Sequence, residues 1–294
     1  MSDILRTTKD LIKIRSTAEN PAGLEEVIDY AVSFFAGDDL SIRKYRRGGK
    51  PSVVIATEES LEYDIILCGH LDVVPAEEEM FQPRLSDGKL FGRGAADMKS
   101  GCAVLLHLMK EFARRKKPSL ALILTTDEEV GGRCGVGYLT GEVGYRAGAV
   151  IIPDCGGEST SQLVLRNKGV LQIKVSATGR SAHASRPWEG ENAIEKLFEA
   201  ARKIKAIMAE KDEKDPPDEH WRNTVNIASF QAGQATNVVP DRAEMTLDIR
   251  FTSQDSPAEI LSYLKKRLPR YRLEKLLDGA GIFTSEDHPI VRKY

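Results

Sequence analysis

Three apolar runs in this sequence each end in residues of the types that bind metal ions. The runs and the polar residues that follow them are 65–69 with His70 and Asp72, 120–126 with Asp127, Glu128 and Glu129, and 149–153 with Asp154. A further acid, Asp97, lies in the glycine-rich stretch 92–97, just before a helical pattern. Imidazole and carboxylate groups are common ligands of zinc and related ions. One histidine and several acids would therefore form a metal site if the fold gathered them.

The elements that carry these residues have the pattern of an α/β sheet. Short apolar runs that alternate with helical patterns are typical of buried strands. We expect strands at residues 53–56, 65–68, 120–126 and 149–153, and helices at 3–15, 24–36 and 97–115. In open sheets of this class the ligand site lies outside the carboxyl ends of the strands. His70 and the acids would therefore meet at one sheet edge, and this arrangement favours a metallohydrolase.

The pattern changes after Asp154. Leu171, Ile173, Val175 and Ala177 alternate with polar residues, as in a half-exposed strand. The elements expected after this strand are a helix at 192–211, a loop at 211–219, strands at 224–231 and 242–251, a helix at 257–267 and a strand at 272–277. The order β-α-β-β-α-β predicts a second domain of the ferredoxin-like α+β type.

Composition argues against several classes of partner. The 42 Lys and Arg residues nearly balance the 44 Asp and Glu residues, with a net charge of -2, so we expect no nucleic-acid partner. The basic run 43–47 is interpreted as a solvated turn between strands. We find neither a signal-peptide pattern nor the roughly 18 apolar residues of a membrane span. The four cysteines are Cys68, Cys102, Cys134 and Cys155, and they show no C-x-x-C spacing. We therefore expect a soluble, reduced, cytoplasmic protein.

A series of motifs in this order resembles the M20 family of di-zinc metallopeptidases and deacylases, which includes acetylornithine deacetylase, succinyl-diaminopimelate desuccinylase, aminoacylase and carboxypeptidase G2. The motifs are GHLDVVP at 69–75, DGKLFGRGAADMK at 87–99, TDEE at 126–129, GRSAHA at 179–184, NVVP at 237–240 and DIR at 248–250. The resemblance implies an α/β fold with a mostly parallel-stranded catalytic domain, helices on both faces, and an inserted ferredoxin-like lid and dimerisation domain. The first part of the catalytic domain would span residues 1–165 and the lid 166–278. Residues 279–294 would begin the return to the catalytic domain.

The resemblance also implies a set of metal ligands. His70, a bridging Asp97 and Asp154 would hold one metal ion, while Asp97, Glu129 and a final histidine would hold the second. Nitrogen and oxygen ligands suit Zn²⁺, and Co²⁺ or Mn²⁺ would substitute for it. A cis peptide bond between Asp97 and Met98 is implied as well.

Roles in catalysis and substrate binding follow from the same resemblance. Asp72 would fix the imidazole of His70, and Glu128 would be the general base that returns its proton to the leaving amine. His183 would reach the active site of a partner subunit and stabilise the oxyanion. Asn237 and Arg250 would hold the substrate's carboxylate. The expected protein is a homodimer through the lid domain that hydrolyses an N-acyl amino acid or a small peptide.

Each residue also has an ordinary structural interpretation. His70 could be a buried structural histidine, Asp97 a helix N-cap, and Glu128 with Glu129 a charged helix start. Asp154 could belong to a turn, His183 to the surface, and Arg250 to a salt bridge at a strand edge. These alternatives concern the seven positions just named.

One departure from the family pattern opens a second hypothesis. The chain stops at Tyr294, where the return to the first sheet would begin, and its only late histidine, His288, does not match the final ligand motif. The alternative is therefore a truncated, catalytically impaired homologue that binds one metal or a ligand without turnover. A nucleotide-binding module is less favoured, because no phosphate-cradling glycine motif is found.

Overall fold

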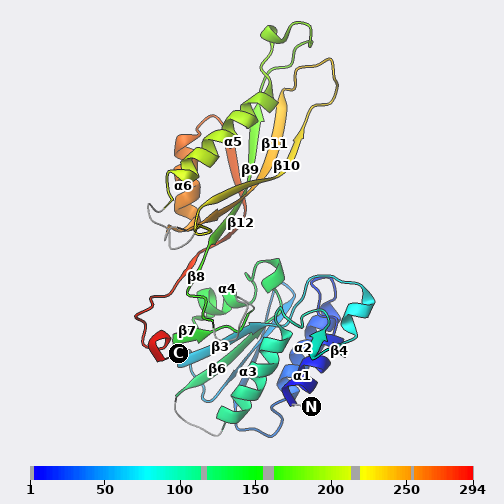
Figure 1. Cartoon of the computed structure of the whole chain (residues 1–294), viewed down its shortest axis with the longest axis vertical. Helices are drawn as coiled ribbons and strands as arrows, with labels where there is room; N and C mark the ends of the chain where they lie inside the picture. The colour runs from blue at the N-terminus through cyan, green and yellow to red at the C-terminus, as the bar shows by residue number, and fades with distance from the viewer. Residues whose placement is uncertain (1–2, 114–117, 155–161, 213–218, 253–254, 294) are drawn as a thin grey trace. The chain divides into compact units, whose positions relative to one another are not determined.

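The computed structural model describes residues 3–113, 118–154, 162–212, 219–252 and 255–293 (Figure 1). The chain divides into two compact units, Met1–Gln162 and Leu163–Tyr294, which are called the first and the second unit. Cys155 and residues 213–218 of the expected loop at 211–219 lie outside the described residues. Within the described part of the chain, no helix combines the length and the apolar character that crossing a membrane would need.

The first unit is built around a five-stranded sheet. Its helices and longer strands are α1 (Asp3–Lys13), α2 (Pro21–Ser33), β1 (Ser41–Arg47), β2 (Lys50–Ala56), β3 (Glu62–His70), α3 (Lys99–Phe112), β6 (Leu120–Thr125), α4 (Val136–Tyr138) and β7 (Arg146–Ile151). A small hairpin of β4 (Arg84–Ser86) and β5 (Lys89–Phe91) precedes α3. The predicted helices and strands of this unit are present, with ends that differ from the predicted ones by up to three residues. The peptide bond between Asp97 and Met98 is cis, as the resemblance implies.

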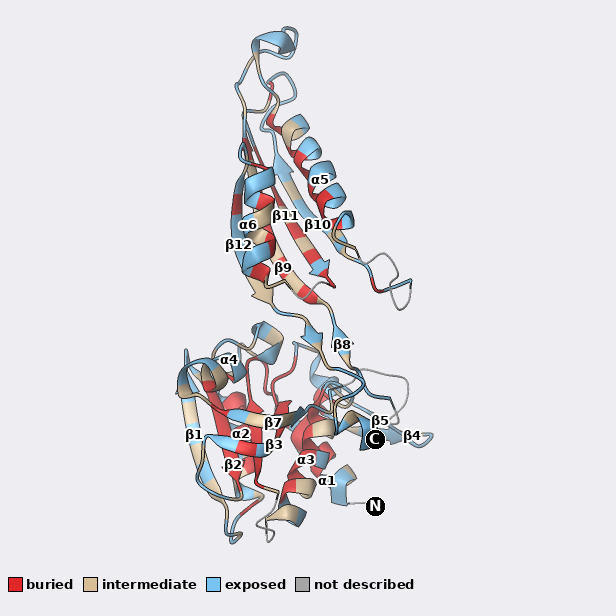
Figure 2. Cartoon of the chain, turned by 90° about the vertical axis from the view of Figure 1, so that its left-hand side faces the viewer, coloured by how far each residue is buried: buried red, intermediate tan, exposed pale blue. Residues whose placement is uncertain are grey.

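The strand order β1-β2-β6-β3-β7 places the ligand-bearing strands side by side. β3 runs parallel to both β6 and β7, whereas β1 and β2 are antiparallel to their neighbours, so the sheet is mixed. Every residue of β6 is buried, as expected for a strand with covered faces (Figure 2). One apolar core lies between this sheet and α1, α2 and α3, and a second contains Leu139 and Tyr145 beside α4. The carboxyl ends of β3, β6 and β7 therefore meet at one edge.

The interpretation of residues 43–47 as a turn is wrong, because they form most of the edge strand β1. Their basic side chains reach acids on neighbouring segments: Arg43 contacts Glu59, and Lys44 contacts Asp29. Charged side chains on an edge strand discourage pairing with other sheets. The residues of β1 alternate in exposure in the structure, but the nearly uninterrupted basic run at 43–47 gave no such alternation in the sequence.

The second unit has the predicted β-α-β-β-α-β order. Its elements are β8 (Arg166–Asn167), β9 (Gly169–Thr178), α5 (Ala193–Ala209), β10 (Thr224–Ala232), β11 (Arg242–Phe251), α6 (Pro257–Arg267), β12 (Arg272–Gly279) and β13 (Ile282–Phe283). The strands β10-β11-β9-β12 form an antiparallel sheet in that order, and the core packs α5 and α6 against it. The short strands β8 and β13 pair with each other. The predicted α/β class with a ferredoxin-like second unit is confirmed.

Candidate metal centre

The predicted ligands of the first unit lie at the carboxyl edge of its parallel strands. His70 is the last residue of β3. Glu128 and Glu129 begin the short helix η2 (Glu128–Val130) just after β6, and Asp154 follows β7. Asp97 reaches the same place from the turn that precedes α3. The sheet topology thus gathers side chains from four separate segments.

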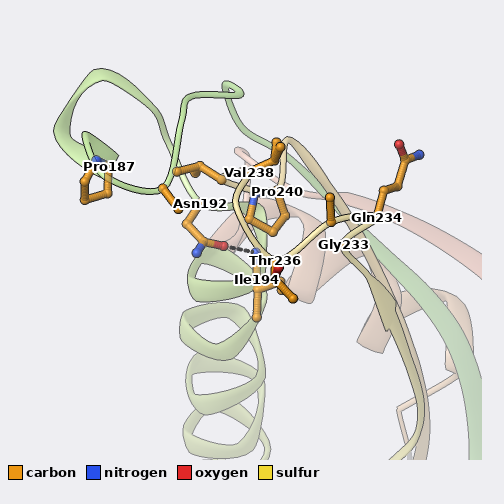
Figure 3. A pocket seen from close by; sticks show the side chains of 11 residues that line it. Pro187, Asn192, Ile194, Gly233, Gln234, Thr236, Val238 and Pro240 are labelled. Carbon is orange, nitrogen blue, oxygen red and sulfur yellow. Dashed lines mark hydrogen bonds between the residues drawn. The ribbon is translucent and has the colours of Figure 1, made fainter.

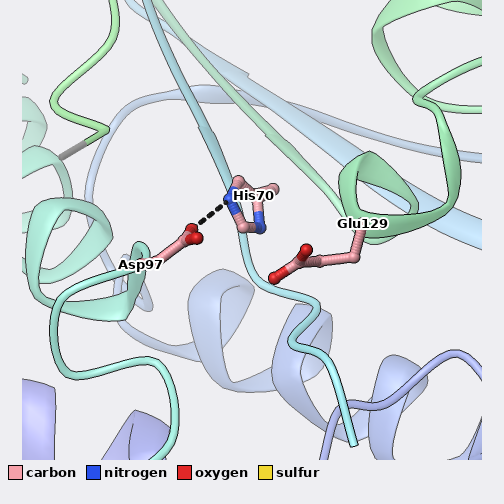
Figure 4. Close-up of side chains that lie close together, drawn as sticks. All are labelled: His70, Asp97 and Glu129. Carbon is pink, nitrogen blue, oxygen red and sulfur yellow. Dashed lines mark hydrogen bonds and ion pairs between the residues drawn. The ribbon is translucent and has the colours of Figure 1, made fainter. Parts of the chain in front are cut away.

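Three of these residues form a compact group of ligand atoms (Figure 4). The ligand atoms of His70, Asp97 and Glu129 all lie within 4.8 Å of one another. His70 Nε2 is 3.0 Å from Asp97 Oδ1. The side chain of His70 is only 3% exposed, whereas that of Asp97 is 55% exposed, so the group opens to solvent on the side of the acid.

Two further acids border this group. Glu128 Oε2 and Asp154 Oδ2 each lie 3.9 Å from His70 Nε2. The structure therefore brings together all four predicted metal ligands of the first unit and the predicted general base. Their individual roles remain predictions.

Asp72 contacts more than the imidazole for which it was predicted. The closest oxygen of Asp72 to His70 Nδ1 is its backbone carbonyl, at 3.0 Å, while its carboxylate Oδ1 is 3.5 Å away. The carboxylate instead accepts the backbone N–H groups of Glu128 at 3.2 Å and Glu129 at 3.0 Å. Asp72 is completely buried, so these bonds lie away from solvent.

The backbone of His70 contacts two sulfur atoms, from Met98 and Cys102, which were not among the predicted site residues. His70 N donates to Met98 Sδ at 3.3 Å, and Cys102 Sγ donates to His70 O at 3.1 Å. Both residues are fully buried. The spacing of Met98 and Cys102, one turn apart beside Asp97, is the only sequence signal of this contact.

The electrostatics of the group favour a bound cation. Burial alone would lower the pKa of His70, but Asp72 and Glu128 outweigh burial and raise that pKa to about 9. Burial raises the pKa of Glu128 and of Glu129, and neighbouring acids raise both further. The carboxylates around this group thus outnumber its one imidazole, so the group has an excess of negative charge. An imidazole and carboxylates in this arrangement fit a divalent metal ion, which would supply the compensating positive charge.

The remaining predicted residues belong to the second unit. His183 forms a bridge with Val238, and Ala184 N donates to the carbonyl oxygen of Asn237 at 2.9 Å, so His183 and Asn237 lie at the same end of this unit. Arg250 lies near the far end of β11, where it pairs with Thr224. The nine strand residues from 242 to 250 are separated by eight residue-to-residue steps, which span roughly 26 Å. The structure therefore does not bring Asn237 and Arg250 together within one copy of this unit.

A cavity of about 580 Å³ lies beside His183 and Asn237, between the start of α5 and the loop that leads into β11 (Figure 3). Its walls are largely apolar and include Pro187, Ile194 and Val238. The side-chain oxygen of Asn192, which also lines it, accepts the backbone N–H of Ile194 at 2.9 Å and so caps the helix. This cavity thus has no acidic or imidazole side chain in its lining, and the metal-ligand chemistry lies in the first unit.

Two family profiles match the chain. The profile described as the peptidase dimerisation domain matches residues 165–274, which lie in the second unit. The profile described as peptidase family M28 matches residues 52–214, which include the segments that carry His70, Asp97 and Glu129.

The chain is also similar to named proteins and solved structures. It is 30% identical over 272 residues to the succinyl-diaminopimelate desuccinylase of Corynebacterium glutamicum, covering 91% of this chain and 71% of that protein. It is 28% identical to a probable carboxypeptidase of Aspergillus clavatus, covering 92% of this chain and 67% of that protein. An M20 family metallo-carboxypeptidase from Sulfolobus solfataricus has the same fold, with a TM-score of 0.74, 18% identity, and coverage of 99% of this chain and 82% of that one.

Proposed function

The chain belongs to the M20 family of metallopeptidases and is a metal-dependent amide hydrolase, and from this premise we propose its metal, its substrate class and the roles of its residues. The metal is zinc. The substrate is an N-acyl amino acid or a small peptide. The observation that carries this proposal is the convergence of His70, Asp97 and Glu129 within 4.8 Å, with Glu128 beside them.

The proposed ligand assignment is the one that the resemblance to the M20 family implies, and the proximity of these side chains supports it. His70, Asp97 and Asp154 would hold one zinc ion, and Asp97 with Glu129 would hold part of a second site. Zinc at this place would polarise the scissile carbonyl and lower the pKa of a water molecule. Asp97 is suited to a bridging role because its side chain lies beside His70 and is more than half exposed.

Glu128 is the general base of the proposed reaction. Its carboxylate lies 3.9 Å from His70 Nε2 and is partly exposed, so it can approach both the ligand group and a bound substrate. It takes a proton from the attacking water and delivers that proton to the leaving amine. Asp72 fixes the backbone of Glu128, and this limits the positions from which the carboxylate can act.

Substrate recognition requires residues of the second unit. Arg250 would bind the substrate's carboxylate, and its guanidinium is held by Asp248 through bonds of 2.7 and 3.2 Å. His183 and Asn237 lie at the opposite end of this unit, so they would act from the partner subunit, with His183 stabilising the oxyanion. A complete site would then require two copies of the chain.

The edge strand β10 is the proposed surface of the homodimer. β10 is the outer strand of its sheet, and most of its residues are exposed. Phe198 of α5 is 50% exposed and stacks on Phe230 of β10, with ring centroids 5.3 Å apart. An edge strand flanked by one exposed aromatic ring, Phe198, favours pairing with a second copy across a twofold axis.

The domain organisation and location are part of the same proposal. Residues 1–165 are the first part of the catalytic domain, residues 166–278 are the lid and dimerisation domain, and 279–294 begin the return to the catalytic domain. Cys68, Cys102 and Cys134 are free thiols, and this suits a reducing cytoplasm.

The test combines metal analysis with activity on the same preparations. The wild-type protein should contain zinc and hydrolyse members of a panel of N-succinyl and N-acetyl amino acids and dipeptides. Treatment with a chelator should abolish hydrolysis, and added Zn²⁺ should restore it. Glu128→Gln should keep its zinc but lose at least about a hundredfold in kcat, whereas Glu62→Gln, at the other end of β3, should behave as wild type.

Unchanged turnover in Glu128→Gln would refute the proposed base. The alternative of a homologue that binds metal without turnover is not favoured, because the similar proteins include a desuccinylase and a probable carboxypeptidase. Zinc binding without hydrolysis of any panel member would revive that alternative.

A further inference from the structure

Lys99, the first residue of α3, has a completely buried side chain. Its ammonium Nζ donates to the carbonyl oxygens of Leu11 at 2.8 Å and Ile14 at 2.7 Å. These carbonyls lie at the end of α1, where helical carbonyl groups lack partners within the helix and the helix dipole attracts a cation. Burying a lysine is costly unless its donors are satisfied. The fold thus uses a buried amino group to join the end of α1 to the start of α3.

The segment that follows α1 also bonds to the turn after β3. Ser16 is fully buried, and its Oγ donates to the carbonyl oxygen of Leu71 at 2.6 Å. Val73 N donates to Ser16 O at 3.0 Å, and Thr17 forms a parallel bridge with Val73. Ser16 therefore holds the chain immediately after His70.

Residues 14–17 thus form a brace between the turn that carries Asp97 and the end of β3, where His70 is followed by Leu71. Through Ile14 the brace contacts Lys99, two residues after Asp97. Through Ser16 it contacts Leu71, which directly follows His70.

We propose that Lys99 and Ser16 are positioning residues, which hold the turns of Asp97 and His70 at the separation that a shared metal ion requires. This inference rests on the proposed function, because it assumes that both residues are metal ligands. Groups that orient metal ligands typically contribute ten- to hundredfold to metal affinity. Lys99 makes two bonds, so its loss should have the larger effect.

The experiment uses the full chain with four variants. Lys99→Met removes the donors while keeping an unbranched side chain, Ser16→Ala removes the hydroxyl, and the double variant combines them. Lys110→Met is the matched control, because Lys110 lies on the same helix and donates to the carbonyl oxygen of Phe34 at the end of α2, at 2.8 Å. Zinc affinity is measured by competition with a chromophoric chelator, and the rise in Tm on adding Zn²⁺ is measured in parallel.

The two readouts separate positioning from stability. A purely structural role would lower the Tm of the metal-free protein, but would leave the zinc affinity and the zinc-induced rise in Tm unchanged. We expect Lys99→Met to weaken zinc binding by about ten- to hundredfold and Ser16→Ala to weaken it severalfold. The double variant should lose less than the product of the two, because both residues act through one brace. Lys110→Met should bind zinc as wild type does.

The inference is overturned if Ser16→Ala and Lys99→Met bind zinc with wild-type affinity, whatever their stability. Should Lys99→Met fail to fold, the affinity of Ser16→Ala decides: a severalfold loss supports the brace, and no loss refutes it. A wild-type protein that bound no zinc would refute the proposed function and with it this inference. Normal wild-type binding with unaffected variants would refute the inference alone.

Discussion

The carboxylate of Asp72 holds the backbone of Glu129. Asp72 Oδ2 accepts the N–H of Glu129 at 3.0 Å, and Oδ1 accepts the N–H of Glu128 at 3.2 Å. Because Asp72 follows His70 by two residues, one buried side chain joins the ligand-bearing end of β3 to the acidic turn after β6. The imidazole of His70 is closer to the backbone carbonyl of Asp72 than to its carboxylate. Asp72 therefore joins two of the proposed ligands, His70 at the end of β3 and Glu129 in the short helix η2.

Substituting Asp72 by Asn should weaken metal binding as well as stability. An amide offers one acceptor oxygen and one NH₂ donor, so one of the two backbone N–H groups would face a donor. We expect zinc affinity to fall by about ten- to hundredfold and the free energy of unfolding to fall by about 1–3 kcal/mol. Chelator competition and denaturant titration measure the two effects.

Asp64→Asn is the matched control for this substitution. Asp64 also lies on β3, and its Oδ2 accepts the backbone N–H of Ser119 at 2.8 Å, but at the end of the strand away from the ligands. It should lose stability without losing zinc affinity. Equal losses of affinity in both variants would contradict the orienting role of Asp72.

The site was predictable from the sequence because its location depends on strand ends. Apolar runs that stop at His70, Asp127 and Asp154 become adjacent once β3, β6 and β7 pair in parallel. The contacts of Met98 and Cys102 with the backbone of His70 were not predictable, because their periodicity indicates only a buried helix face. Which atom a buried sulfur contacts depends on the packing of α3 against β3.

In the second unit, the sequence predicted the elements correctly but not the distance between two proposed site residues. Its six elements and their ferredoxin-like order followed from alternation and helical spacing, and the structure confirms them. Asn237 and Arg250 are close in sequence, and the motifs that contain them led us to assign both to one carboxylate. The strand β11 lies between them and separates them by most of its length. Proximity in sequence therefore did not give proximity in space.

Gly101 should be required for the position of Asp154. A Cβ atom at Gly101 would lie 2.4 Å from the carbonyl oxygen of Pro153, the residue just before Asp154. Alanine normally stabilises a helix by about 1 kcal/mol relative to glycine, but in Gly101→Ala the backbone of Pro153 must move. We expect lower thermal stability and a severalfold loss of zinc affinity. Gly141→Ala, where nothing lies within 4 Å of the added atom, should preserve both.

Phe198→Glu should convert the proposed dimer into monomers. The ring is 50% exposed and stacks on Phe230 at the edge strand, so a carboxylate there would place like charges across a twofold interface. Size-exclusion chromatography with light scattering measures the mass. Leu276→Glu is the control, because Leu276 is 45% exposed on β12 at the opposite edge of the same sheet. Dissociation by the control but not by Phe198→Glu would place the interface on β12.

Asp248 should make the stability of the second unit depend on pH. Hydrogen bonds from Arg250 hold the pKa of Asp248 below its usual value. Burial opposes this effect in part, and a hydrogen bond from Gln172 adds to it. A carboxyl group whose pKa is lowered by folding stabilises the folded state above its unfolded pKa of about 3.9. That contribution is lost as the pH falls through the lower folded value. Because Arg250 is about half exposed, we expect Asp248→Asn to cost less than about 1 kcal/mol near neutral pH.

The fluorescence of Trp221 allows this effect to be measured in the intact chain. Both tryptophans, Trp188 and Trp221, lie in the second unit, and Trp221 is buried while Trp188 is 75% exposed. Urea titrations followed by fluorescence therefore report on this unit, and the difference between wild type and Asp248→Asn should shrink as the pH is lowered below about 4. Glu244→Gln is the control. Glu244 lies on the same strand, and its carboxylate accepts a hydrogen bond from the Ser176 hydroxyl instead of a guanidinium, so the stability difference caused by this variant should depend less on pH. A difference for Asp248→Asn that stayed constant with pH would show that the ion pair with Arg250 does not stabilise the fold.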